Sequence, residues 1–295
     1  MAGSLNCLPC VDAEARAAAA RSLLDISRDD AKALGQTAVV ACARGSYVAA
    51  SGRVVDWRGE IQHARTLKRS IPPDASLAPF ATGVVSSTDV QVCNETTLQA
   101  GRRLLEQGRR PLALNLANGV TPGGGFLNGD RTQEESLCRA SALYETLEGD
   151  PMYAFHRSRP EPDSSDWMIL SPQVPVFRDD AGLALEQPWL LDFLSAAAPY
   201  APKVGQPRSG ELLQQRIHRA LAVSASHGYQ TLVLGAWGCG AFGNDPARTA
   251  RDFRAALEVE FAGCFEHIVF AITDGSPERR MLGPFRDAFR ATGLG

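Results

Sequence analysis

The chain has 295 residues, which is enough for one large domain or two modest ones. Hydrophobic residues make up 44% of it and charged residues 21%, and this balance excludes an intrinsically disordered protein. The formal net charge of −3 argues against a protein that binds duplex DNA through a broad basic surface. A small anionic ligand held by backbone N–H groups remains compatible with this charge.

Seven cysteines are scattered along the chain, an odd number that favours a reducing compartment over a disulfide framework. Cys7 and Cys10 form a C-x-x-C, but a zinc site would need two further ligands at matching spacing, so a reduced thiol pair is the simpler interpretation. Charged residues interrupt the first 25 positions, and no run of about 18 apolar residues exists. We therefore expect a cytoplasmic protein without metal, cofactor or membrane contact.

The N-terminal part of the chain is expected to be mainly helical. Residues 11–26 are rich in Ala with charges on one face, which predicts a helix. Residues 47–50 and 53–57, separated by a Ser-Gly pair, predict a small hairpin. A Pro-rich break then places a boundary near residue 80. Residues 1–80 would form a helical N-terminal extension, and residues 81–295 a separate α/β domain.

After this boundary the sequence alternates between strand and helix patterns. The predicted strands are 88–93, 111–116, 167–170, 174–177, 231–235 and 268–272, and the predicted helices are 96–107, 132–147, 212–227, 246–261 and 277–291. Several strands are continuously apolar, which indicates a mixed sheet covered by helices on both faces. Stretches rich in Pro and Asp at 157–166, 178–188 and 198–210 read as surface insertions.

Two glycine-rich loops follow predicted buried strands. The first, NGVTPGGG at 118–125, follows the strand 111–116, and its consecutive glycines let a ligand approach the backbone closely. The second, GAWGCGAFGN at 235–244, leads into a helix that begins with Asp245 and Pro246, which is a potential anion site. Because ligands of open α/β sheets bind at the carboxyl ends of strands, the two loops predict a nucleotide diphosphate held between them.

Each loop also has a simpler or different interpretation. Either one could be only a tight turn between a strand and a helix. Gly238, Gly240 and Gly243 formally match the G-x-G-x-x-G dinucleotide fingerprint. The following helix begins only after the third glycine, however, and no second half of a dinucleotide-binding fold precedes it, so nicotinamide oxidoreduction is the less favoured hypothesis.

Acidic residues lie between the first loop and the helix predicted at 132–147. Thr132 and Glu135 have the spacing of a capping box, which would make the acidic residues structural. Alternatively, a carboxylate beside a diphosphate site could protonate a glycosidic oxygen and then activate water. Glu134 and Glu135 are adjacent and diverge by ~100° on a helix, so one would act as acid/base while the other positions sugar hydroxyls.

The motifs together resemble those of bacterial-type poly(ADP-ribose) glycohydrolases. The resemblance rests on GGG at 123–125, on QEE at 133–135 seven residues later, on the flanking LNLAN and SLCR, and on GAFGN at 240–244. It extends from about residue 12 to the C-terminus. It implies a three-layer α/β/α macrodomain fold with a mixed central sheet, a catalytic domain at 81–295 and a mostly helical N-terminal extension.

The resemblance also implies roles for individual residues. Glu135 would be the catalytic acid/base, Glu134 would hydrogen-bond the ribose whose bond is cut, and Gln133 would support that arrangement. Asn118 would contact the same ribose. The two loops would bind the diphosphate and the adenosine, through Gly123, Gly124, Gly125, Gly238, Cys239, Gly240, Ala241, Phe242 and Asn244. No metal or cofactor is implied.

The implied reaction is hydrolysis of the ribose–ribose O-glycosidic bond of poly(ADP-ribose), mainly from chain ends, with release of ADP-ribose. The implied partners are poly(ADP-ribose), ADP-ribose and poly(ADP-ribosyl)ated proteins in the response to DNA damage. A monomer that binds no membrane and no specific nucleic-acid sequence is expected. Two alternatives remain open: a non-catalytic ADP-ribose-binding macrodomain, and a hydrolase of mono-ADP-ribosylated protein or nucleic acid.

Overall fold

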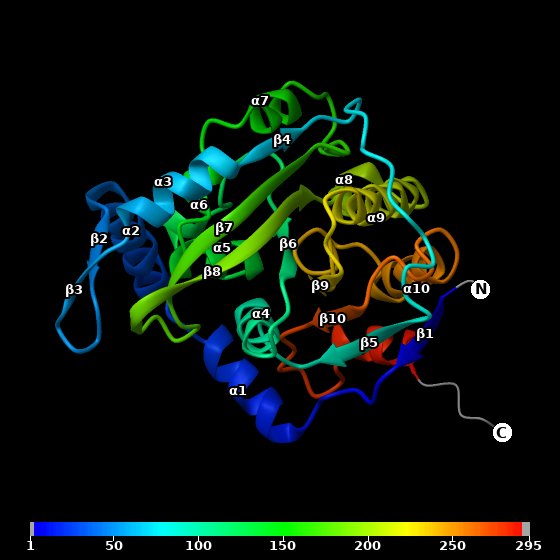
Figure 1. Cartoon of the computed structure of the whole chain (residues 1–295), viewed down its shortest axis with the longest axis horizontal. Helices are drawn as coiled ribbons and strands as arrows, with labels where there is room; N and C mark the ends of the chain where they lie inside the picture. The colour runs from blue at the N-terminus through cyan, green and yellow to red at the C-terminus, as the bar shows by residue number, and fades with distance from the viewer. Residues whose placement is uncertain (1–2, 291–295) are drawn as a thin grey trace.

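An eight-stranded mixed sheet runs through the computed structural model, which describes residues 3–290 (Figure 1). The strand order is β1-β5-β10-β9-β6-β8-β7-β4; the first six strands are parallel, and β7 and β4 each run antiparallel to the preceding strand. The bounds are β1 Ser4–Cys7, β4 Arg69–Ile71, β5 Ser87–Cys93, β6 Pro111–Ala117, β7 Met168–Arg178, β8 Ala184–Ala197, β9 Thr231–Leu234 and β10 His267–Ala271.

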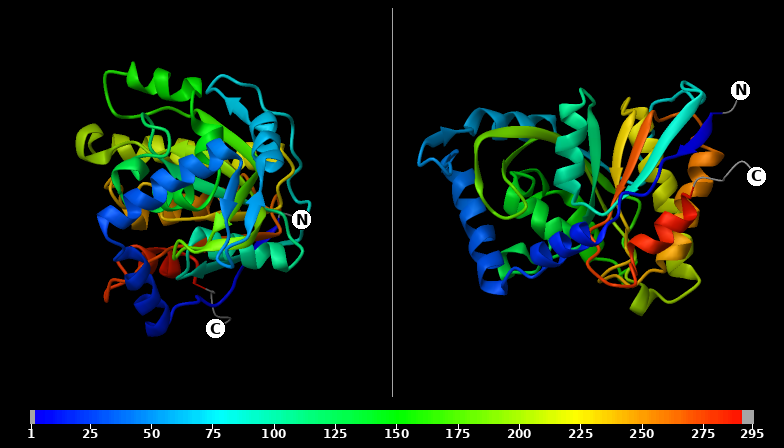
Figure 2. Two further views of the ribbon diagram at one scale, coloured as in Figure 1. Left: turned by 90° about the vertical axis from the view of Figure 1, so that its left-hand side faces the viewer. Right: turned by 90° about the horizontal axis from the view of Figure 1, so that it is seen from below.

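Helices cover both faces of this sheet, as the sequence predicts. Their bounds are α1 Glu14–Leu24, α2 Arg28–Arg44, α3 Arg58–Leu67, α4 Thr97–Glu106, η1 Phe126–Asn128, α5 Gln133–Ala140, α6 Tyr144–Leu147, α7 Pro151–Arg157, α8 Ala201–Val204, α9 Arg208–Ser226, α10 Pro246–Glu258 and α11 Leu282–Ala288. Helix α2 lies at the opposite end of the molecule from α10 and α11 (Figure 2).

Alternating side chains of the central strands fill two separate cores. In β9, Leu232 and Leu234 point into the core formed with α9, α10 and α11, whereas Val233 points into the core formed with α2, α4 and α5. Leu112 and Ala113 of β6 divide in the same way. Successive residues of a strand face opposite sides of a sheet, so a continuously apolar strand is buried on both faces. The predicted α/β/α layering is confirmed.

Several elements match their predicted positions closely. The hairpin strands β2 Ser46–Val48 and β3 Val54–Asp56 pair antiparallel, within the predicted 47–57 region. Helix α4 begins after Thr96, which forms a capping box with Gln99. Helices α9 and α10 lie within a few residues of the predicted bounds. The last predicted helix, 277–291, is shorter in the structure, and residue 291 lies outside the described residues.

Two predictions about element continuity are wrong. The helix predicted at 132–147 is interrupted at Ser141, whose hydroxyl donates to Leu137 O at 2.7 Å and accepts from Leu143 N at 3.2 Å. Such local side-chain bonds compete with the helical ladder, and Ser141 instead has extended backbone and bridges to Val176. The two short strands predicted at 167–170 and 174–177 are one strand, β7, with a register shift between Ser171 and Val174.

Two of the predicted surface insertions also contain regular structure. Residues 178–188 form the turn between β7 and β8 and the first part of β8, which continues to Ala197 beside β6. Residues 198–210 contain α8 and the start of α9. Polar composition marks both stretches as surface, but pairing of β8 with β7 and β6 decides the backbone conformation of the first. Residues 157–166 form a loop that follows α7.

The N-terminal segment contributes more than helices. It contains α1, α2 and α3, and it also supplies both edge strands of the sheet, β1 beside β5 and β4 beside β7. Helix α2 was missed, although its N-cap Ser27 and its C-cap Gly45, in the left-handed region, are sequence signals. Gly35 inside this helix permits close packing, because a Cβ there would lie 2.5 Å from Phe126 O.

Two further findings concern membrane-spanning helices and metal sites. None of the helices in residues 3–290 combines the length and apolar character that a membrane crossing needs. Within the same residues, no group of three or more His, Cys, Asp or Glu side chains is arranged to hold a metal ion, and all seven cysteines are free.

Truncating Phe270 in the core beneath α10 and α11 should destabilise the fold. Its ring is fully buried and lies 4.7–5.4 Å, between ring centroids, from the rings of Phe253, Phe285 and Phe289. We expect Phe270→Ala to lower the free energy of unfolding by about 3–5 kcal/mol in urea denaturation. Val259→Ala, at a side chain that is 76% exposed, should change it by less than about 0.5 kcal/mol. Equal effects would contradict the assigned core.

Candidate active site

The two glycine-rich loops lie at neighbouring strand ends. Strands β6 and β9 are adjacent and parallel, so the loops that follow them leave the same edge of the sheet. Strand β9 pairs with β6 only as far as Ala113, which pairs with Val233. Beyond this point the two strands diverge, and the loops form the walls of a cleft. The structure thus brings both loops to one cleft.

Gln133 connects the start of α5 to the part of β6 that no longer pairs with β9. Its side-chain Oε1 accepts from Leu116 N at 2.8 Å, and its Nε2 donates to Leu114 O at 2.8 Å. The amide therefore bridges two backbone groups of β6 as the peptide group of a neighbouring strand would. Nε2 also donates to Thr97 Oγ1 at 3.0 Å, which connects the same side chain to α4. These bonds satisfy backbone groups that would be costly to bury unpaired.

Glu134 is the most deeply buried carboxylate of the site, with 2% of its surface exposed. Its oxygens accept from Asn118 N at 2.7 Å and from Asn115 Nδ2 at 3.2 Å. Burial raises the pKa of Glu134 to about 8, and the neighbouring charge of Glu135 acts in the same direction. The N–H groups of Asn118 and Gly123 and the Asn115 amide oppose this shift by favouring the ionised form.

Glu135 lies beside the consecutive glycines and is 6% exposed. Its Oε1 accepts from Gly125 N at 3.0 Å, and its Oε2 is hydrogen-bonded to the Thr132 hydroxyl. Gly124 has φ +58°, and a Cβ built there would lie 2.2 Å from Glu135 Oε1. The glycine therefore provides both a left-handed conformation and the space that the carboxylate occupies.

The capping-box interpretation of Thr132 and Glu135 is wrong. Thr132 is the N-cap of α5, but its side chain accepts no hydrogen bond from the helix backbone. Its hydroxyl instead contacts the Glu135 carboxylate, and that carboxylate accepts from the first glycine-rich loop. The acidic residues thus face the loop and the cleft, in contrast to the simpler structural role that their spacing allowed.

Of the two asparagines near β6, only Asn118 lines the cleft. Its Oδ1 accepts from Val120 N at 2.9 Å and Thr121 N at 3.0 Å, which holds the loop in a turn, while its backbone N–H binds Glu134. Asn115 is fully buried behind Glu134 and also donates to Ser195 Oγ at 3.0 Å. Its role is to support Glu134 from within the protein.

The second loop presents backbone donors to the cleft. The N–H groups of Gly240, Ala241 and Phe242 donate to no protein atom within residues 3–290. Gly240 and Ala241 are exposed, and a Cβ at Gly240 would meet nothing within 4 Å. Gly238 has φ +74° and packs closely against Ala198 and Asn244. Successive free N–H groups of this kind form an anion-binding concavity.

Cys239 and Asn244 lie in the interior of the second loop and do not line the cleft. Cys239 is buried, and its thiol donates to Trp237 O at 3.4 Å. Asn244 is buried and donates to Pro199 O at 2.9 Å and Gly238 O at 3.2 Å. These two residues hold the loop in shape, so the free N–H groups of their neighbours point outward.

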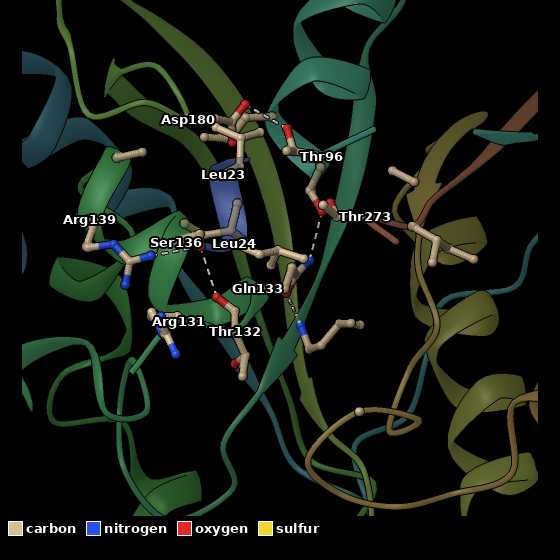
Figure 3. A pocket seen from close by; sticks show the side chains of 18 of the residues that line it. Leu23, Leu24, Thr96, Arg131, Thr132, Gln133, Ser136, Arg139, Asp180 and Thr273 are labelled. Atoms are coloured by element: carbon tan, nitrogen blue, oxygen red, sulfur yellow. Dashed lines mark hydrogen bonds between the residues drawn. The ribbon is translucent and has the colours of Figure 1, made fainter. Parts of the chain in front are cut away.

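Two contiguous cavities occupy the cleft. The Gln133 cavity has a volume of about 390 Å³, and Figure 3 shows Gln133 and other side chains of its wall. Gly238 and Gly240 of the second loop also line it. The glutamate cavity, of about 550 Å³, is lined by Glu134 and Glu135. Both volumes are in the range of small-molecule sites. The two cavities share Leu24, Leu116, Arg131, Thr132, Ala241 and Phe242.

Some residues of the Gln133 cavity carry no sequence signal. Leu23 comes from the end of α1, and Asp180 from the turn between β7 and β8, which the sequence pattern marks only as an insertion. Asp180 Oδ2 accepts from Thr96 Oγ1 at 2.7 Å, and burial raises the pKa of Asp180 to about 6 (Figure 3). Only folding brings these side chains to the site, since they lie far apart in the chain.

His156 supports the first loop from behind, through hydrogen bonds of both ring nitrogens. Its Nδ1 lies 2.9 Å from Gly119 O, and its Nε2 lies 2.7 Å from Ser165 Oγ and accepts from Ser165 N at 3.1 Å. Burial lowers the pKa of His156 to about 4, so the ring is neutral at neutral pH. The contact joins the 157–166 loop to the residue after Asn118.

Comparisons with known proteins agree with this geometry. The family model described as the catalytic domain of microbial-type poly(ADP-ribose) glycohydrolase (PARG) matches residues 35–179. The solved poly(ADP-ribose) glycohydrolase from Thermomonospora curvata is 40% identical, with a TM-score of 0.81, and the match covers 88% of this chain and 99% of that one. The same enzyme has also been solved bound to the inhibitor ADP-HPD.

A second solved relative is the poly(ADP-ribose) glycohydrolase from Deinococcus radiodurans in complex with ADP-ribose. It is 40% identical, with a TM-score of 0.71, over 79% of this chain and 98% of that one. A comparison with curated proteins finds no match. Because 40% identity extends over nearly the whole length of both solved enzymes, the chain belongs to the family of microbial-type poly(ADP-ribose) glycohydrolases.

Proposed function

We propose that the protein hydrolyses the ribose–ribose O-glycosidic bond of poly(ADP-ribose) and releases ADP-ribose. The observation that carries this proposal is the pair of buried carboxylates, Glu134 and Glu135, on the wall of a cleft whose opposite loop presents free N–H groups. A carboxylate pair suits glycoside hydrolysis, and the N–H groups suit a diphosphate. The ADP-ribose bound in the Deinococcus relative supports the same ligand here.

The two cavities suggest how the ligand lies. The adenosine occupies the Gln133 cavity, and Phe242, which lines both cavities, packs against it. The diphosphate lies where the cavities meet, against Gly240 and Ala241 and facing the glycines of the first loop. The distal ribose enters the glutamate cavity beside Asn118. In this arrangement the shape of the two loops depends on Gly123, Gly124, Gly125 and Gly238.

Glu135 is the acid/base in the mechanism that we propose. It gives its proton to the leaving oxygen as the bond from that oxygen to the anomeric carbon breaks. It then accepts a proton from the water whose oxygen attacks that carbon, and this restores the protonated acid. The Thr132 hydroxyl beside Glu135 can act as donor or acceptor, so it suits both protonation states. Glu134 orients the ribose hydroxyls, and Gln133 fixes the helix that carries both.

Cleavage from chain ends is the finer part of the proposal. Leu23 at the end of α1 and Ile26 between α1 and α2 line the Gln133 cavity together with Asp180 from the β7–β8 turn. A unit inside a polymer carries a second link on its adenosine side and would need an additional opening there. A terminal unit has no such link.

The seven free cysteines support a cytoplasmic location, because disulfides are rare in reducing compartments.

A purely binding macrodomain is the less favoured alternative. It would use Glu134 and Glu135 only to begin α5, and the absence of a Thr132 cap bond removes the structural reason for that pattern. A hydrolase of mono-ADP-ribosylated protein or nucleic acid would share the cleft and differ in the leaving group.

Replacing the proposed acid/base should separate catalysis from binding. We expect Glu135→Gln to lose roughly 10²–10⁴-fold in the rate of ADP-ribose release from poly(ADP-ribose), because the proton donor is lost. Calorimetry should show that it still binds ADP-ribose, since Gln keeps the shape of the side chain. Glu60→Gln, on the exposed surface of α3, is the matched control. Wild-type rates in Glu135→Gln would rule out this mechanism.

The buried Glu134 should make stability depend on pH. Its pKa of about 8 exceeds the ordinary value of 4.5, so its contribution to stability is complete below about pH 4.5 and is lost as pH rises through 8. Urea denaturation from pH 5 to pH 9 should therefore show the wild type losing stability relative to Glu134→Gln, which cannot titrate. Glu60→Gln should not gain in this way. A constant difference between wild type and Glu134→Gln would contradict the raised pKa.

Filling the space beside Glu135 should impair catalysis through position alone. Gly124→Ala would place a methyl group 2.2 Å from Glu135 Oε1 and force a left-handed conformation on alanine. We expect the rate of ADP-ribose release to fall by about tenfold or more, since small displacements of a catalytic group are costly. Gly59→Ala on α3 is the matched control, because a Cβ there would have no atom within 4 Å. This variant should retain the wild-type rate. Equal rates in both variants would show that the carboxylate position is not critical.

A further inference from the structure

The glutamate cavity continues past its two carboxylates to an opening lined by basic side chains. Its inner wall contains Glu134 and Glu135, which are almost completely buried. Its outer wall contains Leu24, Arg28, Gly129, Asp130 and Arg131. The Arg28 side chain is 69% exposed, and Arg131 is also exposed. A substrate whose bond lies at the glutamates therefore has its leaving portion toward this opening, where Arg28 lines the glutamate cavity alone and Arg131 lines both cavities.

The two arginines are held in place and still have free donors. Arg28 Nε donates to Asn128 O at 2.9 Å, and its Nη2 donates to Asp130 Oδ1 at 3.1 Å. Arg131 Nη1 donates to Ile26 O at 2.9 Å. Within residues 3–290, Nη1 of Arg28 and both Nε and Nη2 of Arg131 donate to no protein acceptor. The backbone contacts orient each guanidinium, so less side-chain freedom is lost when it binds a ligand.

The chemistry of the leaving portion also favours cations at this opening. Glu134, Glu135 and Asp130 place three carboxyl groups on this cavity. Each unit of poly(ADP-ribose) carries an ionised diphosphate, and the leaving portion begins with an adenosine ribose that bears one on its 5′ side. Guanidinium groups bind phosphate oxygens through directed hydrogen bonds. An uncharged leaving group would make no use of Arg28 and Arg131.

We infer that Arg28 and Arg131 form a leaving-side subsite that binds the diphosphate of the polymer unit beyond the scissile bond. This inference rests on the proposed function. The subsite comes from the N-terminal segment and from the loop before α5, so the segment outside the predicted 81–295 domain takes part in substrate choice. It favours an ADP-ribose polymer over a single ADP-ribose attached to a protein side chain, which offers no second diphosphate.

The test compares two substrates with the same scissile bond. The first is a dimer of ADP-ribose, and the second is ADP-ribose joined through its anomeric carbon to the 2′-oxygen of adenosine, which lacks the second diphosphate. We expect Arg28→Gln and Arg131→Gln each to lower the ratio of kcat/KM for the dimer to kcat/KM for the adenosine conjugate by about three- to tenfold. Arg28→Lys should lose less, because it keeps the charge.

Arg109→Gln is the matched control. Arg109 precedes β6 at the opposite end of that strand from the cleft, and its guanidinium pairs with Glu266 at 3.6 Å. We expect this variant to keep the wild-type ratio. Added salt should lower the ratio in the wild type more than in Arg131→Gln, because one phosphate contact fewer remains to be screened.

The possible outcomes separate a failure of the proposed function from a failure of the inferred subsite. If the wild type cleaves neither substrate, the proposed function fails, and the inference fails with it. If the wild type cleaves both and the arginine variants keep its ratio, the inference alone is overturned. Equal losses on both substrates would also overturn it, since they would show that the arginines support the fold or the bound ADP-ribose rather than the leaving portion.

Discussion

The side-chain amide of Gln133 holds the site together, because it takes the place of a strand at the point where β9 leaves β6. It bonds both a carbonyl and an N–H group of β6, at Leu114 and Leu116, and thereby sets where α5 begins. The next two residues are the glutamates, so their position depends on this attachment. Without it, two backbone groups would be unpaired at the edge of a buried strand, and α5 would have no fixed start.

This geometry places two carboxyl groups where water is largely excluded. Burial raises the pKa of Glu134, and the two carboxyl groups have different hydrogen-bonding partners. Glu134 accepts from a backbone N–H and from the amide of Asn115, whereas Glu135 accepts from Gly125 and contacts a hydroxyl. The anionic character of the site is offset by free N–H groups on the second loop and by the arginines at its opening. A diphosphate ligand is therefore compatible with neighbouring glutamates.

Local patterns predicted the central strands and the helices that pack on both faces, because a period of two residues or a run of apolar residues is written into each segment. They did not predict β1, β4 and β8, since those strands are short, polar or mixed and are defined by their neighbours. The break at Ser141 was missed because a single hydroxyl, bonded to Leu137 O and Leu143 N, decided it. The long α2 could have been found from Ser27 and Gly45.

The sequence alone determined which groups are candidates for the site: the glycine-rich loops and the QEE segment are visible in it, because those chemistries require specific residues at specific spacing. Only the tertiary structure decided which neighbours each group has. The contact of Thr132 with Glu135 in place of a helix cap, and the approach of Leu23, Arg28 and Asp180 to the cleft, depend on residues that are distant in the chain or on rotamers. Such contacts leave no periodicity in the sequence, since they arise when separate elements pack against the same strand ends.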